Sequence, residues 1–205
     1  TSMTNDSPFR WLFIVIFLGA VFISGSFRRR ARQLGGTIPR AREGAPNMLL
    51  RLLVAAPLYL SFLAYMLNPQ WMDWSSWPLP AWLRWLGAGV GLGTLPVLYW
   101  VMVSIGKNIS ETYLTKESHA LVTHGPYRWI RHPLYTVATG AFVSLGVVAS
   151  NWFIMAIAVV AFLGIAIVVV PKEEGELVRR FGAAYQEYQL RSGKLSPRWR
   201  RGRTG

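Results

Sequence analysis

Five apolar stretches dominate the sequence, and each is close to the length that an α-helix needs to cross a bilayer. They occupy residues 9–27, 48–67, 81–106, 134–150 and 151–170. A helix spans the hydrocarbon core with about 20 apolar residues. Because no linker separates the fourth stretch from the fifth, these two are expected to form a tight antiparallel hairpin. The sequence therefore predicts an all-α integral membrane protein with about five transmembrane helices and a cytoplasmic C-terminal helix.

The placement of charge supports this architecture. Charged residues make up 15% of the chain, against about 25% in a typical soluble domain. Nineteen of the 22 lysines and arginines fall in three segments that face the cytoplasm if the N-terminus lies outside. These segments are 27–47, 107–133 and 171–205. The outer segment 68–80 has no basic residue and carries Trp71, Trp74 and Trp77 instead. This asymmetry follows the positive-inside rule.

Composition also limits the classes of partner and cofactor. Topology and contact with anionic lipid headgroups account for the formal charge of +13, so no nucleic-acid partner is expected. The chain has no cysteine, which excludes a disulfide framework, a thiolate zinc site and a thiol nucleophile. No metal site is predicted, because the histidines do not stand at ligand spacing with carboxylates. The glycine-rich segment 87–93 lies inside an apolar stretch and predicts close helix packing rather than dinucleotide binding.

One short segment, "HGPYRWIRHPLYTV" at residues 124–137, is unusually polar for this chain. Its Gly-Pro pair predicts a turn, and Pro133 predicts the first turn of a helix. A second polar segment follows the fifth stretch and begins with Glu173 and Glu174. Because the hairpin returns the chain to the same membrane face, Arg131 and His132 are expected to lie opposite these two acids. Ionisable groups at this depth favour a functional site.

Each of these residues also has a structural interpretation that the sequence leaves open. Membrane anchoring would explain Arg128 and Arg131, and a solvated helix face would explain the two acids. His132 would serve as a helix cap. Tyr185 and Tyr188 are expected to pack at the membrane interface as part of an amphipathic C-terminal helix. The joint pattern, rather than any single residue, favours function.

The segment "SHALVTHGPYRWIRHPLYT", followed by an apolar hairpin and "EEGELVRRFGAAYQEYQLR", resembles the isoprenylcysteine carboxyl methyltransferase family of integral membrane enzymes. Phospholipid N-methyltransferases are close in chemistry and share a Glu-Glu motif. The resemblance begins at Ser118, whereas residues 1–105 match only in being transmembrane. It implies a methyltransferase that depends on S-adenosylmethionine, with a cofactor pocket built from the C-terminal region.

Carried over position by position, the resemblance implies a set of site residues. The cofactor contacts would be His119, Ala120, Leu121, Val122, Tyr127, His132, Pro133, Leu134, Tyr135 and Glu173. The catalytic residues would be Arg131 and Glu174. The eukaryotic members place an acceptor-binding arginine where this chain has Val169, and a glycine where it has Val137. Lys172 or Arg131 would have to replace that arginine.

The expected function is methyl transfer to a lipophilic acceptor at the cytoplasmic interface, either the carboxyl group of a prenylated compound or a lipid headgroup. Two alternatives stay open: an NADPH-dependent membrane reductase of the sterol type, and a non-catalytic membrane binding or scaffold protein. Residues 1–106 are expected to form the transmembrane part and residues 107–205 the catalytic region, which contains the hairpin 134–170. A prokaryotic inner membrane is the expected location.

Overall fold

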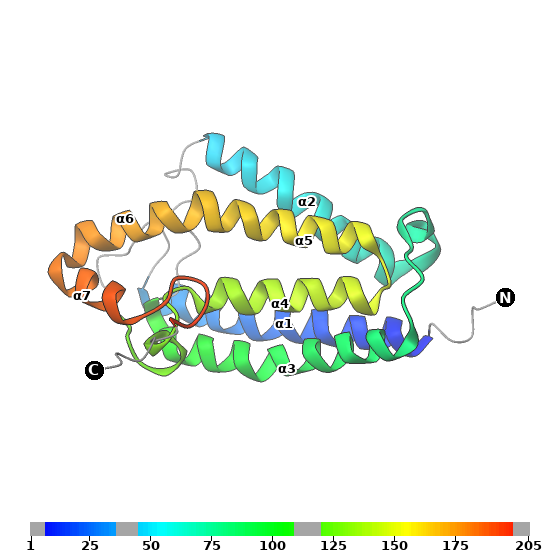
Figure 1. Ribbon diagram of the computed structural model, residues 1–205, viewed down its shortest axis with the longest axis horizontal. Helices are drawn as coiled ribbons and strands as arrows, with labels where there is room; N and C mark the ends of the chain where they lie inside the picture. The colour runs from blue at the N-terminus through cyan, green and yellow to red at the C-terminus, as the bar shows by residue number, and fades with distance from the viewer. Residues whose placement is uncertain (1–6, 36–44, 109–119, 199–205) are drawn as a thin grey trace, which may run out of the picture.

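The computed structural model describes residues 7–35, 45–108 and 120–198, and every regular element in these ranges is helical. The helices are α1 (Ser7–Gly35), α2 (Ala45–Leu67), α3 (Ala81–Ile105), α4 (Pro133–Val148), α5 (Trp152–Gly164), α6 (Val170–Phe181) and α7 (Ala183–Arg191). The short elements are η2 (Pro69–Ser75), η3 (Gly106–Asn108), η4 (Gly125–Arg128) and the π-turn η5 (Ile165–Val169). The predicted all-α class is confirmed, and the apolar helices run side by side in one elongated bundle (Figure 1).

All five predicted apolar helices are present, but only three described helical segments are long and apolar enough to cross a membrane: Pro8–Gln33, Ala81–Ile105 and Trp152–Phe181. The other two apolar helices are shorter, at Leu52–Leu67 and Pro133–Val148. Helix α4 has 16 residues, which gives about 24 Å of helix against about 30 Å of hydrocarbon. The expected set of about five apolar helices is therefore present: three are long apolar helices, α4 is short, and α2 has 23 residues, of which Leu52–Leu67 form the apolar part.

The tight hairpin between α4 and α5 is confirmed. Only residues 149–151 separate the two helices. Asn151 is buried and caps α5, because its Oδ1 accepts a hydrogen bond from the backbone N–H of Ile154 at 3.0 Å. Its Nδ2 donates to the Met72 carbonyl at 3.1 Å and to Ser75 Oγ at 2.7 Å. One amide thus joins the hairpin to the η2 segment at the end of the bundle near the N-terminus (Figure 1).

Two arginines outside the three basic segments cap helices at this same end. Arg10 donates to the carbonyls of Met66 and Leu67 at the C-terminus of α2, over 2.7–3.1 Å. Arg84 donates to the Val148 carbonyl at the C-terminus of α4 over 3.0 Å, and its guanidinium lies 3.9 Å from the Phe9 ring centroid. Basic side chains stabilise the exposed carbonyls of a helix end. Their placement at the end of the bundle near the N-terminus therefore has a structural cause.

The apolar pattern predicts that the fifth helix ends near residue 170, but helix α5 does not end there. It continues through η5 into α6, so that Trp152–Phe181 is one 30-residue helix. A proline inside an α-helix clashes with the carbonyl four residues earlier. Here the π-turn precedes Pro171, and the Val170 N–H bonds to the Ile165 carbonyl, five residues back. The wider turn accommodates the ring, and Glu173 and Glu174 are carried on a rigid helix rather than on a loop.

The glycine-rich segment packs helices together, as predicted. A Cβ atom on Gly87 would lie 2.7 Å from Val147 Cγ1 of α4, and a Cβ on Gly91 would lie 2.7 Å from both Ile16 Cδ1 and Ser144 Oγ. Gly87 and Gly91 are one helical turn apart, and both are buried where α3 meets its neighbours. Small residues at this spacing let helix backbones approach closely in membranes.

We expect Gly91→Val to lower the unfolding free energy by about 1–3 kcal/mol, because the added carbons overfill the contact between α1, α3 and α4. Gly89→Val is the matched control, since a Cβ at that position meets nothing within 4 Å. Thermal unfolding of the detergent-solubilised protein would measure both variants. Equal midpoints for the two variants would contradict the packing role of Gly91.

Candidate functional site

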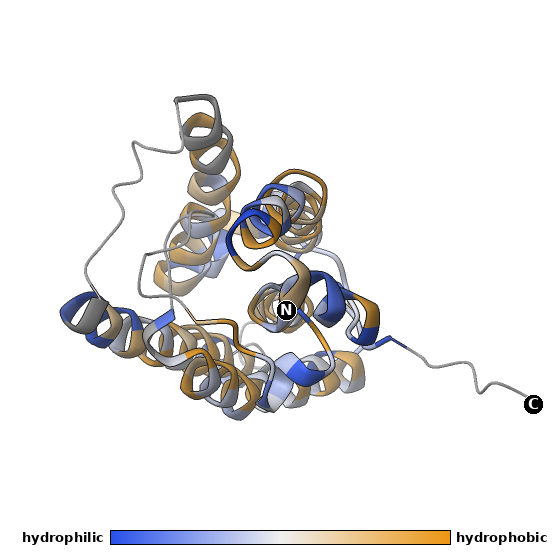
Figure 2. Cartoon of the chain, turned by 90° about the vertical axis from the view of Figure 1, so that its left-hand side faces the viewer, coloured by the Kyte–Doolittle hydropathy of each residue, from blue (hydrophilic) through white to orange (hydrophobic). Residues whose placement is uncertain are grey.

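The polar segment before α4 turns the chain at the end of the bundle opposite the hairpin loop. Gly125 has φ +59°, a backbone conformation that favours glycine, and a Cβ there would collide with the Ser104 side chain. Helix η4 follows, and then α4 begins with Pro133 as its first residue and His132 as its N-cap. Both features agree with the sequence. Hydrophilic residues gather at this end of the molecule, around α6 and α7 (Figure 2).

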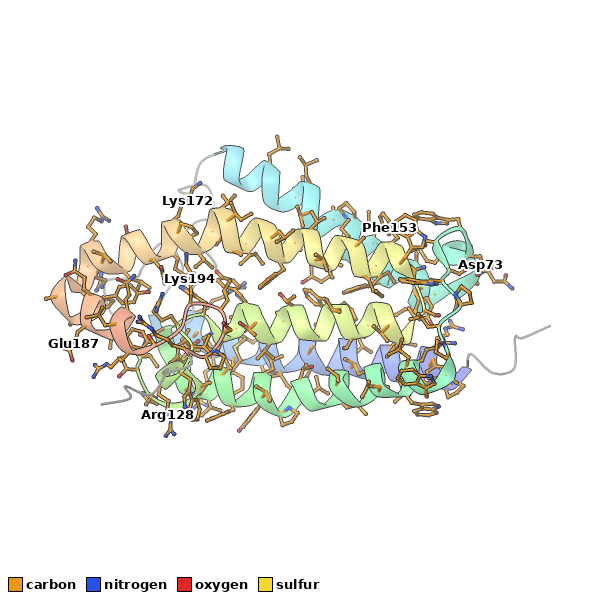
Figure 3. The ribbon with its side chains drawn as sticks, viewed as in Figure 1. Asp73, Arg128, Phe153, Lys172, Glu187 and Lys194 are labelled. Carbon is orange, nitrogen blue, oxygen red and sulfur yellow. The ribbon has the colours of Figure 1, made fainter. Side chains whose placement is uncertain are left out.

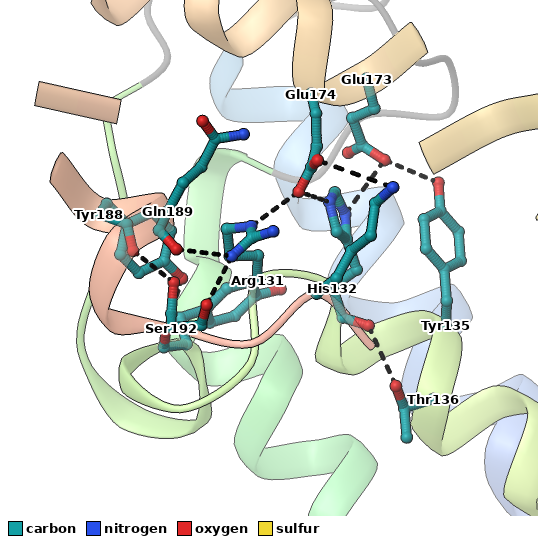
Figure 4. A network of polar contacts seen from close by, with 11 residues as sticks. Arg131, His132, Tyr135, Thr136, Glu173, Glu174, Tyr188, Gln189 and Ser192 are labelled. Carbon is teal, nitrogen blue, oxygen red and sulfur yellow. Dashed lines mark hydrogen bonds and ion pairs between the residues drawn. The ribbon is translucent and has the colours of Figure 1, made fainter. Parts of the chain in front are cut away.

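Five of the predicted site residues meet in one polar network (Figure 4). They are Arg131, His132, Tyr135, Glu173 and Glu174. The Arg131 Nε donates to Glu174 Oε1 at 2.7 Å. The two His132 ring nitrogens each lie 3.5 Å from a carboxylate oxygen, Nδ1 from Glu173 and Nε2 from Glu174. The Tyr135 hydroxyl donates to Glu173 Oε2 at 3.1 Å. The hairpin and the continuous α5–α6 helix therefore bring two distant polar segments into contact.

Arg131 is built into the structure around it. Its side chain is 10% exposed and that of Glu174 is 14% exposed. Besides the bond to Glu174, its Nη1 donates to the carbonyls of Gln189 at 3.2 Å and Ser192 at 2.6 Å. Removing one partner of a largely buried ion pair leaves an uncompensated charge. Arg131 thus holds α6, α7 and the start of α4 together.

The residues after α7 form a C-terminal strap, residues 192–195, that lies against the start of α4. Its backbone makes three hydrogen bonds with residues 129–132: Gly193 N–H donates to the Trp129 carbonyl, Arg131 N–H to the Gly193 carbonyl and His132 N–H to the Lys194 carbonyl, over 2.8–3.1 Å. Thr136 Oγ1 also donates to the Leu195 carbonyl at 2.6 Å. The strap places Lys194 beside the network (Figure 3), with Nζ 3.8 Å from Glu174 Oε2.

The His132 ring is 5% exposed and lies between the two carboxylates. Burial disfavours the charged imidazolium, but Glu173 and Glu174 outweigh this effect, and the pKa of His132 is raised above its ordinary value. Nε2 makes no hydrogen bond to any described residue, although Glu174 lies 3.5 Å away. Its ring stacks on Tyr135, with centroids 5.9 Å apart and planes 21° from parallel.

We expect the stability of the protein to fall as the pH rises through the raised pKa of His132. The folded state binds this proton more tightly than the unfolded chain, so the stabilisation is complete below about pH 6.5, the unfolded pKa. It is then lost as the pH rises through the folded pKa. The thermal midpoint against pH would show this slope, and His132→Asn should remove it. His124→Asn, a change of an exposed histidine, should keep it. A slope unchanged in His132→Asn would contradict the assignment.

Tyr127, one of the predicted cofactor residues, is buried and held by α7. The Tyr188 hydroxyl donates to the Tyr127 carbonyl at 2.5 Å, and burial raises the pKa of Tyr127 and raises that of Tyr188 to about 12. Tyr185 is 1% exposed, and its hydroxyl has no hydrogen-bond partner among the described residues. The predicted packing role of Tyr185 and Tyr188 agrees with their burial.

Other predicted residues lie away from the network. Ala120 is exposed, and its backbone N–H and carbonyl pair with the Asn108 side chain at 3.1 and 3.2 Å. Leu121 and Val122 follow it and are half-buried, and His119 lies outside the described residues. Leu134 packs on a buried cluster that includes Leu98 and Met102, so its side chain contributes to helix packing.

Several residues of the site could not be found by sequence reasoning. Lys194 sits in a polar tail with no recognisable motif, and its position depends on backbone pairing between distant segments. Gln189 and Ser192 contribute only backbone carbonyls to Arg131, so their side chains carry no signal for this contact. Asn108 follows the third apolar stretch, where one polar residue has no distinctive pattern. In residues 7–35, 45–108 and 120–198, no group of three His, Asp or Glu residues is placed to hold a metal ion.

Comparison with known proteins links this site to a family. Residues 89–179 match the family model of the isoprenylcysteine carboxyl methyltransferase (ICMT) family. The nickel-cobalt-cadmium resistance protein NccN of Alcaligenes xylosoxydans xylosoxydans is 31% identical over 115 residues, which cover 56% of this chain and 53% of NccN. The cobalt-zinc-cadmium resistance protein CzcN of Cupriavidus metallidurans is 30% identical over 118 residues, or 56% of this chain and 54% of CzcN. The chain thus spans about half the length of these curated relatives.

A solved structure shares the fold. The structure of the eukaryotic intramembrane Ras methyltransferase ICMT matches with a TM-score of 0.57 and 20% sequence identity, over 91% of this chain and 67% of that one. The family match contains the polar segment, the hairpin and both acids of the network. The resemblance inferred from the sequence is confirmed: residues 89–179 match the family model of the isoprenylcysteine carboxyl methyltransferase family, and the fold is similar to that of the solved ICMT structure.

Proposed function

We propose that this protein is a membrane methyltransferase that uses S-adenosylmethionine to methylate a lipophilic acceptor at the membrane surface. The observation that carries the proposal is the network of Arg131, His132, Tyr135 and the two glutamates, which lies within the segment that matches the family model. The site lies at one end of apolar helices. A water-soluble donor and a lipidic acceptor can both reach such a position.

The chemistry of the site residues fits the proposed cofactor. The Glu173 side chain is 27% exposed, and a carboxylate beside an aromatic ring favours a cationic ligand. Two buried polar atoms, His132 Nε2 and the Tyr185 hydroxyl, have no hydrogen-bond partner among the described residues. Buried polar atoms are usually hydrogen-bonded, so a ligand with polar groups or ordered water would satisfy them.

Residues from both polar segments would hold S-adenosylmethionine, which supplies an electrophilic methyl group on a sulfonium when bound. Glu173, Tyr135, His132 and Tyr127 would provide charge, aromatic faces and hydrogen bonds. The remaining contacts would come from Pro133, Leu134 and residues 119–122. Methyl transfer is an in-line displacement, in which positioning supplies much of the rate.

The roles of Arg131 and Glu174 follow from their contacts. Arg131 would act as a positioning residue, because it bonds to Glu174 and to two carbonyls. Glu174 would fix the His132 ring from one side, as Glu173 does from the other. A carboxylate acceptor is already ionised and needs no strong base. An amine acceptor must lose a proton, and Glu174 or His132 would receive it.

The proposal includes an orientation in the membrane. The basic end of α1, residues 28–32, and the site lie at the same end of the bundle (Figure 1). By the positive-inside rule this end faces the cytoplasm and the N-terminus lies outside, with a prokaryotic inner membrane as the location. Residues 107–205 would form the catalytic region, and residues 1–106 would form its transmembrane support.

Calorimetry on the protein purified in detergent tests the proposal. S-adenosylmethionine and S-adenosylhomocysteine should bind and NADPH should not. Binding of NADPH alone would instead support a membrane reductase, and the absence of binding by all three would support a scaffold. Incubating the protein with lipid extracts and methyl-labelled S-adenosylmethionine would then identify the acceptor from the labelled product.

A further inference from the structure

We infer that Lys194 is the residue that binds a carboxylate of the ligand in this site. The inference rests on the proposed function. It assigns a ligand-binding role to a lysine that belongs to no sequence motif. Both classes of ligand can supply the anion, since S-adenosylmethionine has a carboxylate at its amino-acid end and a prenylated acceptor can end in one. Because Glu173 and Glu174 are both acidic, the site needs a cationic side chain to bind either ligand carboxylate.

Arg131 does not meet this requirement. Its Nε bonds to Glu174, and its Nη1 bonds to the carbonyls of Gln189 and Ser192. The side chain is 10% exposed, so binding a ligand would break contacts that hold α6 and α7. Lys172 projects from the side of α6 that faces away from Lys194 (Figure 3). At the position of the acceptor-binding arginine of the eukaryotic members, Val169 is apolar and lies within the π-turn.

The backbone of Lys194 is held by hydrogen bonds, while its side-chain ammonium group can still bind a ligand. The carbonyls of Gly193 and Lys194 accept hydrogen bonds from Arg131 and His132, at 2.8 and 3.1 Å, so the C-terminal strap cannot move without disturbing the start of α4. A Cβ on Gly193 would overlap the Ser196 carbonyl oxygen, which shows how closely the strap folds back on itself.

The ammonium group of Lys194 is only loosely paired. Its Nζ lies 3.8 Å from Glu174 Oε2, which is longer than the roughly 2.7–3.2 Å of a hydrogen bond. The nearer partner of Glu174 is Arg131, at 2.7 Å from its Oε1. The Lys194 side chain is 42% exposed, and an ammonium carries three donors. A ligand carboxylate can therefore reach Lys194 while Glu174 keeps its bond to Arg131.

Calorimetry with two pairs of probes tests the inference. S-adenosylhomocysteine and 5′-methylthioadenosine differ in the amino-acid end, and N-acetyl-S-farnesylcysteine and its methyl ester differ in the carboxylate. Lys194→Met should weaken binding of the carboxylate-bearing member of one pair about 10- to 100-fold, as expected for a charged hydrogen bond, and leave the other member unchanged. The affected pair identifies the source of the carboxylate.

Control variants distinguish the effect of the charge at position 194 from effects of net charge and of misfolding. Lys194→Arg should retain most of the affinity, and Arg191→Met, which removes a charge exposed on α7, should bind as the wild type does. Thermal midpoints close to wild type would show that all three variants are folded. If Lys194→Met binds all four probes with wild-type affinity, the inference is wrong. If the wild type binds neither adenosine probe, the proposed function itself fails.

Discussion

Arg131→Met should lower the unfolding free energy by about 3–5 kcal/mol, the typical cost of removing one partner from a buried ion pair. The substitution leaves Glu174, 14% exposed, without its 2.7 Å partner. It also removes the donor to the carbonyls of Gln189 and Ser192, so α7 and the C-terminal strap lose one of their attachments to the start of α4. Thermal unfolding in detergent would show the loss, and methyl transfer should fall with it because the network is no longer held.

Two further variants make this result specific. Arg128→Met changes an exposed arginine that stacks on the Trp129 ring at 3.9 Å, and it should cost less than about 1 kcal/mol. Adding Glu174→Leu to Arg131→Met should restore part of the loss, since the double variant leaves no buried unpaired charge. Similar midpoints for Arg131→Met and Arg128→Met would show that the ion pair does not stabilise the site.

Glu173→Gln should separate ligand binding from stability. Its carboxylate accepts a hydrogen bond from Tyr135 at 3.1 Å, and a glutamine oxygen can accept the same bond. The change in unfolding free energy should therefore stay below about 1 kcal/mol. Loss of the negative charge opposite a sulfonium should weaken S-adenosylmethionine binding about 10- to 100-fold. Calorimetry on the folded variant would measure this effect.

The controls for Glu173→Gln come from the same region. Glu187→Gln removes an acid that is 70% exposed on α7, and it should bind the cofactor as the wild type does. Glu174→Gln should instead lower stability, because it weakens the pairing of Arg131. Wild-type affinity in Glu173→Gln would show that this carboxylate does not face the cofactor.

The apolar helices and their order could be predicted from the sequence because local composition decides them. Runs of apolar residues specify helices in a membrane, where the backbone must satisfy its own hydrogen bonds. The absence of a linker between the fourth and fifth stretches specified the hairpin, and Pro133 marked the start of α4. From these features it also followed that Arg131 and His132 would face Glu173 and Glu174.

Helix ends and spans were less predictable. The apolar pattern stops near residue 170, but backbone hydrogen bonding continues through the π-turn to Phe181. Helix α1 likewise extends past its apolar residues through the basic segment 28–32. Hydropathy reports where a helix leaves the lipid and not where its hydrogen bonds end. The short length of α4 reflects the turn residues on both sides of it.

The sequence by itself determined the helical class, the hairpin and which polar residues approach one another, since these depend on local composition and chain order. Only the tertiary structure decided what each side chain does: Arg131 bonds inside the network, Leu134 packs on the core, and the C-terminal strap places Lys194 beside Glu174. Arg131 and the strap are held in place by bonds to backbone atoms about 60 positions away, and these atoms are the same in every residue. No pattern of side chains encodes these bonds, so they become visible only when the chain is folded.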